Sequence, residues 1–143
     1  MKTSARNQFA GTISHLDIGP VTAQVTLTLA GGGEITAALT AASAQRLALA
    51  KGKEAIALVK SSAVVLVTDL AGYQLSARNQ LAGTISRVDK GAVNSAIGVT
   101  LPGGAVVTAI VTNDSVAALG LAVGKPATAV FKAYAVMLAV ASK

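Results

Sequence analysis

The sequence predicts a mainly β protein made of two tandem OB-type barrels, each with five strands and a short helix between strands three and four. The first observation behind this prediction is a duplication. An eleven-residue segment that begins at Ser4 returns at Ser76 with one substitution, and 32 of 64 residues are identical when the surrounding copies are aligned without a gap. The second observation is an alternation of apolar and polar residues, which indicates strands, interrupted once per copy by a helical stretch.

The five strands of the first copy are predicted from this alternation and from the turns between them. Residues 8–17 form the first strand, and residues 21–29 alternate so regularly that they predict a half-buried second strand. Three consecutive glycines at 31–33 predict a hairpin turn into a third strand over residues 34–40. The fourth and fifth strands are expected over residues 54–60 and 64–67, with counterparts at 126–132 and 136–140.

An alanine-rich stretch over residues 40–49 changes to the helical period, and Thr40 offers a hydroxyl that can cap it. Its counterpart, residues 112–121, offers Asn113 and Asp114 as stronger capping residues, and Gly52 and Gly124 are expected to end the two helices. The helix favours an OB-type barrel over the alternative, an SH3-like barrel, which does not need it. The predicted domains are residues 1–70 and 71–143.

The composition indicates a small aliphatic core and an oligomer. Hydrophobic residues make up 52% of the chain but aromatic residues only 3%, so the core is expected to consist of Val, Ala, Leu and Ile. Units of this length bury little surface, and packing against further copies would compensate. The chain has no cysteine, which excludes disulfides and thiolate metal sites. Its first residues lack the apolar region of a signal peptide, so a cytoplasmic location without membrane contact is expected.

An enzyme, a cation site and a nucleic-acid site are all weakly supported. His15 is the only histidine, its counterpart is Arg87, and the six acidic residues are scattered, so neither a catalytic residue, a cofactor nor a bare metal cation is expected. Single-stranded nucleic acid is the main alternative ligand because basic OB folds often bind it on aromatic platforms. Only four aromatic residues could serve, and two of them lie in apolar strand patterns: Phe9, Phe131, Tyr73 and Tyr134.

Donor side chains remain as the candidate site. Both copies keep a serine and an arginine at the start of the first strand, a threonine where the third strand meets the helix, and a lysine at the end of the fourth strand. These groups donate hydrogen bonds, and no carboxylate stands among them, so they suit a ligand that only accepts, namely a deprotonated tetrahedral oxyanion. The residues are Ser4, Arg6, Thr40, Lys60 and Ser61 in the first copy and Ser76, Arg78, Thr112 and Lys132 in the second.

The segment Ser-Ala-Arg-Asn-Gln-x-x-Gly-Thr-Ile in both copies, followed by Gly-Ala-Val-Asn in the second, resembles the Mop domain of the molbindin family. Two such domains in tandem resemble the cytoplasmic di-Mop molbindins of the ModG type. The resemblance implies OB-type barrels, a homotrimer, and storage or buffering of molybdate or tungstate at interfaces between barrels. It implies the donors named above as ligands, together with the backbone at Ala5, Ala77 and Ala133.

The two copies depart from each other at positions that the resemblance assigns to anion binding. Ser61 is replaced by Ala133, which removes a hydroxyl from the second site. The resemblance also implies a further, second-type anion site on the Gly-Ala-Val-Asn loop, which the first copy replaces with Gly-Pro-Val-Thr. The candidate residues of this second-type site are Gly91, Val93, Asn94 and Ser95, with Val21 and Thr22 as their counterparts.

Overall fold

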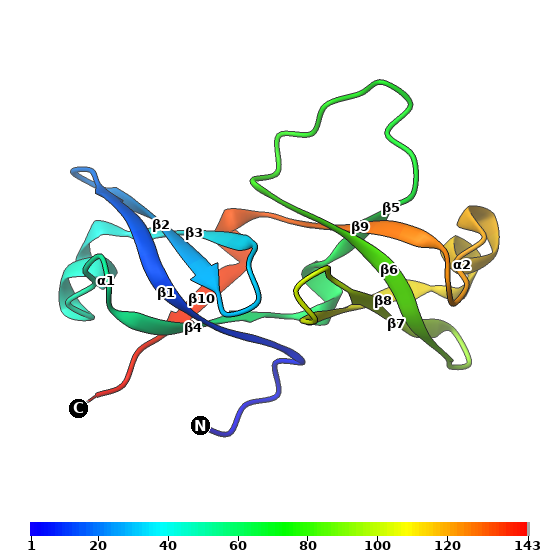
Figure 1. Cartoon of the computed structure of the whole chain (residues 1–143), viewed down its shortest axis with the longest axis horizontal. Helices are drawn as coiled ribbons and strands as arrows, with labels where there is room; N and C mark the ends of the chain where they lie inside the picture. The colour runs from blue at the N-terminus through cyan, green and yellow to red at the C-terminus, as the bar shows by residue number, and fades with distance from the viewer. Residues whose placement is uncertain (143) are drawn as a thin grey trace.

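The computed structural model describes residues 1–142 and contains two five-stranded sheets that lie side by side (Figure 1). Each sheet curls toward a barrel, and the two short helices lie at opposite ends of the molecule. The predicted mainly β fold with two tandem barrels is therefore confirmed. The elements of the first copy are β1 (Asn7–Ile18), β2 (Thr22–Leu29), β3 (Glu34–Thr40), α1 (Ala41–Arg46), β4 (Glu54–Val59), the 3₁₀ turn η1 (Ser61–Ala63) and β5 (Val65–Val67).

The second copy repeats this order of elements with small changes in length. Its fourth and fifth strands begin at the predicted residues and each ends one residue earlier than predicted. Its elements are β6 (Asn79–Lys90), β7 (Asn94–Thr100), β8 (Val106–Thr112), α2 (Asn113–Leu119), β9 (Pro126–Phe131), the 3₁₀ turn η2 (Ala133–Ala135) and β10 (Val136–Ala139). Within residues 1–142, neither helix is long and apolar enough to cross a membrane.

The last strand of each copy belongs to the other copy's sheet. The strand order is β10-β4-β1-β2-β3 in one sheet and β5-β9-β6-β7-β8 in the other. Figure 1 shows β10 crossing into the barrel of β1 and β4, while β5 lies beside β9. Val136 pairs with Val59 in one sheet and Val65 pairs with Val130 in the other. Each barrel is thus completed by a strand from the other half of the chain.

The core follows the predicted alternation and continues from one half into the other. Val25 and Leu27 on β2 are fully buried, as are Ile35 and Ile97, whereas Val21 lies before the strand and is 73% exposed. One large cluster of buried side chains contains residues of both halves, including Phe9, Ile35, Val59, Ile85 and Phe131. Because the two halves share this core, each depends on the other for burial of its apolar surface.

Both helices are shorter than predicted, and in the second copy the residue that caps the helix is not the predicted one. Thr40 caps α1 as expected, because its Oγ1 accepts a hydrogen bond of 3.0 Å from the Ser43 N–H. In the second copy Thr112 is the cap, at 3.1 Å from the Ser115 N–H, so the prediction that Asn113 and Asp114 cap this helix was wrong. Both of those residues already lie inside the first turn of α2.

The expected helix ends at Gly52 and Gly124 were also wrong. The chain leaves the helix earlier, at Ala48 and Gly120, which take the left-handed backbone conformation with φ values of 52° and 64°. The left-handed residue turns the chain out of the helix, and the next N–H donates back to a helical carbonyl at 3.0 Å, from Leu49 to Ala44 and from Leu121 to Val116. Gly52 and Gly124 instead shape the turn that leads into the fourth strand of each copy.

Candidate functional site

Strand pairing brings Arg6 and Lys60 together at one end of the first sheet. Asn7, the first residue of β1, pairs with Val59, the last residue of β4. Arg6 and Lys60 are the next residues outward on these two neighbouring strands, and both are exposed. Ser4 and Ala5 precede Arg6 on the same segment, and Ser61 follows Lys60 as the half-buried first residue of η1. Four of the five predicted donors of the first copy therefore share one end of the sheet.

The second copy reproduces this arrangement. Asn79 pairs with Phe131, which sets exposed Arg78 beside exposed Lys132. The lysines have nearly the same backbone, with φ and ψ of −65° and 134° at Lys60 and −72° and 145° at Lys132. Ala133 occupies the place of Ser61 and is 7% exposed, so this position offers the second site no side-chain donor. Ser76 and Ala77 precede Arg78 as Ser4 and Ala5 precede Arg6.

Thr40 and Thr112 lie away from these clusters. Thr40 pairs with Thr22, next to the pair formed by Ala23 and Ile18, so it lies at the opposite end of the sheet from Arg6. The 12 residues of β1 between these ends correspond to roughly 35–40 Å of extended strand. Thr112 is placed in the same way in the second sheet, opposite Asn94. A single sheet therefore does not bring its threonine to its arginine.

The hydroxyl of each threonine is already engaged with its helix. Thr40 Oγ1 lies 2.9 Å from Ser43 Oγ, and Thr112 Oγ1 lies 2.9 Å from Ser115 Oγ. In each pair the threonine hydroxyl donates to the serine oxygen and accepts from the N–H of the same serine. For the threonine proton to reach a ligand, its donation to the serine must be given up.

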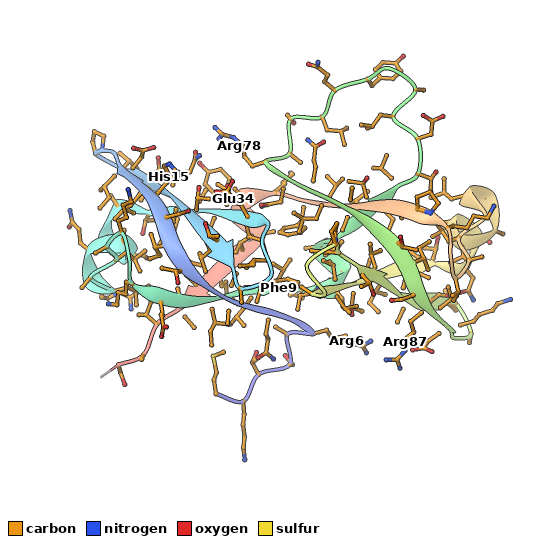
Figure 2. All side chains as sticks on the ribbon, in the orientation of Figure 1. Arg6, Phe9, His15, Glu34, Arg78 and Arg87 are labelled. Atoms are coloured by element: carbon orange, nitrogen blue, oxygen red, sulfur yellow. The ribbon has the colours of Figure 1, made fainter. Side chains whose placement is uncertain are left out.

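The arginines carry positive charge that the described protein groups do not neutralise. Within residues 1–142 the only ion pair joins Arg87 and Asp89, both well exposed, so it contributes little to stability. Figure 2 shows Arg6 and Arg78 on opposite sides of the molecule, with both side chains at the surface. Each guanidinium therefore keeps its forked set of donors available for an anion. In the same part of the chain, no three His, Asp or Glu side chains gather as a metal site.

The loop of the candidate second-type site has the same backbone turn in the two copies but different side chains. The Gly91 N–H donates to the Asn94 carbonyl at 2.9 Å, and the Gly19 N–H donates to the Thr22 carbonyl at 2.8 Å, so the backbone turns alike. Ser95 is 2% exposed, and its hydroxyl donates to Asn113 Oδ1 at 2.5 Å. Gly91, Val93 and Asn94 are exposed, as are Val21 and Thr22 in the first copy.

Comparison with known proteins identifies the family. The TOBE domain model matches twice, at residues 3–66 and 75–138. The chain belongs to the TOBE domain family. It is 67% identical over 140 residues to the molybdenum transport protein ModE of Herbaspirillum seropedicae and 51% identical over 140 residues to that of Azotobacter vinelandii. Each alignment covers 98% of this chain and 52% of the relative, so the chain spans about half the length of these relatives.

A solved structure matches the two TOBE domains over their whole length. It is the cytoplasmic molybdate-binding protein ModG with molybdate bound, and it is 49% identical in sequence. The match has a TM-score of 0.96 and covers 99% of this chain and 100% of the ModG chain. The likeness to ModG therefore includes both domains, in sequence as well as in fold.

Two buried asparagines of the TOBE domains were not predicted from the sequence to have a role of their own. Asn7 Nδ2 donates to the Thr108 carbonyl at 2.8 Å, and Asn7 Oδ1 accepts from the Thr108 N–H at 2.7 Å. Asn79 makes the same two bonds to Thr36, both at 2.8 Å. Each asparagine follows an arginine of the candidate site and joins its strand to the other domain. A polar residue at a core-facing strand position was the available signal.

Proposed function

We propose that the chain binds molybdate or tungstate as a tetrahedral oxyanion and stores or buffers it in the cytoplasm. The observation that carries this proposal is that Arg6 lies beside Lys60, and Arg78 beside Lys132, at the ends of paired strands and at the surface, without an ion-pair partner among residues 1–142. A site rich in charged donors favours a dianion that only accepts hydrogen bonds. The molybdate held by ModG supports the identity of the ligand. The proposal is for a binding protein that is not an enzyme.

The complete site is proposed to lie between chains. Thr40 is separated from Arg6 by the length of its sheet, so we propose that a second chain supplies the threonine that completes the site. An anion at such a contact would join Arg6, Lys60 and Ser61 of one chain to Thr40 of the next. Binding and assembly would then support each other, because each supplies part of the other's interactions.

An apolar outer face supports self-association into the proposed homotrimer. Ala10, Ile56 and Ala139 are opposite one another on three adjacent strands and line a groove of about 650 Å³. Met137 extends this face and is 59% exposed, as is Val65 at the equivalent position of the other sheet. Contiguous apolar surface on the outside of a small protein is typical of an interaction site. A further copy of the chain is the proposed occupant.

Met137→Glu and Val65→Glu should weaken this assembly without unfolding the chain. A charged side chain in an apolar contact must lose its hydration, which is unfavourable unless it is paired. We expect the wild type to sediment as a trimer at micromolar concentration and the double variant to shift to monomer. Gln45→Glu, a matched change at an exposed helix position, should leave the sedimentation unchanged. A monomeric wild type would contradict the trimer.

Selectivity for large oxyanions tests the proposed function directly. Sulfate is smaller than molybdate or tungstate, so in a site of fixed donors it would leave at least one donor without a partner, at a cost of about 1–3 kcal/mol. Calorimetry should therefore show binding of sulfate that is about 5-fold to 150-fold weaker than binding of molybdate. Equal affinity for sulfate would reduce the cluster to a general anion-binding surface.

Single-stranded nucleic acid is the weaker candidate ligand. Phe9 and Phe131 are 5% and 2% exposed, so they belong to the core and offer no face for a base. Base stacking on aromatic side chains supplies much of the binding in nucleic-acid sites of this barrel type. Among residues 1–142, only Tyr73 and Tyr134 remain as exposed aromatic residues.

A further inference from the structure

One charged residue distinguishes β3 of the first domain from its counterpart in the second domain. Glu34 begins β3, and Val106 takes the equivalent place at the start of β8. Both residues are exposed, and their strand partners are equivalent: Glu34 pairs with Thr28 and Val106 pairs with Thr100. The strand pairing is therefore the same at this position, and the two domains differ there by one negative charge.

The start of β3 lies close to the arginine–lysine cluster of the second domain. Asn79, the residue after Arg78, bonds through its amide to the N–H and the carbonyl of Thr36, both at 2.8 Å. Glu34 is two residues before Thr36 on the same strand, which places these two residues about 7 Å apart on the same face. The 3₁₀ turn η2, which follows Lys132, also packs against β3. Figure 2 shows Glu34 and Arg78 on the same side of the molecule.

The cluster of the first domain meets an uncharged residue in the same arrangement. Asn7, the residue after Arg6, bonds to the carbonyl and the N–H of Thr108 at 2.8 and 2.7 Å, and η1 packs against β8. Val106 is two residues before Thr108 on that strand. The first cluster thus consists of two cations close to a valine, whereas the second consists of two cations close to a carboxylate. Within residues 1–142, Glu34 forms no ion pair that would neutralise its charge.

A carboxylate close to an anion site weakens binding for two reasons. It repels a second anion, and it accepts hydrogen bonds that the guanidinium would otherwise donate to the ligand. Charges at a protein surface act on each other over about 8–10 Å at physiological ionic strength. Glu34 is two residues, and Arg78 is one residue, from the contact between Asn79 and Thr36, so we expect their charges to interact.

We propose that Glu34 of the first domain lowers the oxyanion affinity of the site in the second domain, so that the two sites of one chain fill at different anion concentrations. This inference rests on the proposed oxyanion-binding function. It is separate from the missing hydroxyl at Ala133, because Glu34 acts on the ligand through its charge. A chain with two affinities takes up and releases anion over a wider range of concentration than a chain with two equal sites, which suits a buffer.

The test is calorimetry with sodium molybdate on the full chain, in Arg6→Ala and Arg78→Ala backgrounds, each of which keeps one class of site intact. In the Arg6→Ala chain, Glu34→Gln should tighten binding about two-fold to five-fold, the upper part of the range for one pair of exposed charges, because the ligand is a dianion. Glu34→Asp, which keeps the charge, should not. In the Arg78→Ala chain, Val106→Glu should weaken binding by the same factor, whereas Glu34→Gln should have no effect.

Ionic strength separates a charge effect from a change of shape. Between about 0.01 M and about 1 M salt the Debye length falls from about 30 Å to about 3 Å, so the effect of Glu34→Gln should nearly disappear. An effect that persists at high salt overturns the inference, as does unchanged binding in Glu34→Gln at low salt. A wild type that binds no molybdate overturns the proposed function as well. If Glu34→Gln does not fold, Val106→Glu decides, and an unweakened first site then overturns the inference.

Discussion

Replacing Asn79 with alanine is expected to lower the free energy of unfolding by about 2–6 kcal/mol, and Asn7→Ala should do the same. Asn79 is 2% exposed, and its amide satisfies both the N–H and the carbonyl of Thr36 at 2.8 Å. Removing the amide leaves two part-buried backbone groups of Thr36 without their partner, and a group left unpaired away from water costs about 1–3 kcal/mol. These hydrogen bonds join the two halves of the chain, so their removal should lower the stability of both barrels.

Equilibrium unfolding in urea measures this effect, and the neighbouring glutamines provide the control. Gln8 and Gln80 are exposed, and their Nε2 groups donate only to carbonyls of the preceding segment, at 3.1 Å to Ala5 and 2.9 Å to Ala77. Water can replace these bonds, so Gln80→Ala should change the free energy of unfolding by less than about 1 kcal/mol. If Asn79→Ala lowers the free energy of unfolding no more than Gln80→Ala does, the hydrogen bonds of the asparagine do not stabilise the contact between the halves.

The elements of the fold were predictable because their signals are local. The alternation over residues 21–29 needs only the two faces of one strand, and the cap at Thr40 needs only the next three residues. The exchange of the last strands has no local signal. Val64 and Leu66 are the same residues as their counterparts Val136 and Leu138, so either strand finds an equivalent partner in either barrel. Only the three-dimensional structure shows which sheet each of these strands joins.

The candidate site was predictable by chemical type but not by position. Arg6 and Lys60 were assigned to one site because both side chains donate hydrogen bonds. The pairing of β1 with β4 places them at the same end of the sheet. Thr40 was grouped with them for the same reason, yet the sheet separates it from Arg6. The roles of Asn7 and Asn79 needed the structure, because their partners lie 101 and 43 residues away in sequence. Ser95 was predicted as a ligand of the second-type anion site, and in the structure its hydroxyl donates to Asn113.

Arg6→Ala and Arg78→Ala should each weaken molybdate binding at their own class of site by about ten-fold or more, and the double variant should remove it. A charge-assisted hydrogen bond contributes about 1.5–3 kcal/mol, and each arginine is expected to make at least one to the dianion. The fold should survive, because both side chains are exposed and neither forms an ion pair within residues 1–142. Calorimetry gives the affinities, and urea unfolding checks the fold.

Arginine-to-lysine variants distinguish charge from geometry at these positions. Lysine keeps the positive charge but loses the planar fork that meets two oxygens at once, so Arg6→Lys should recover only part of the affinity lost in Arg6→Ala. Ser61→Ala and Ala133→Ser then compare the two domains, since this position is the one donor in which the arginine–lysine clusters differ. Ser61→Ala should weaken the first site toward the second. Unchanged binding in all of these variants would mean that the anion lies elsewhere on the protein.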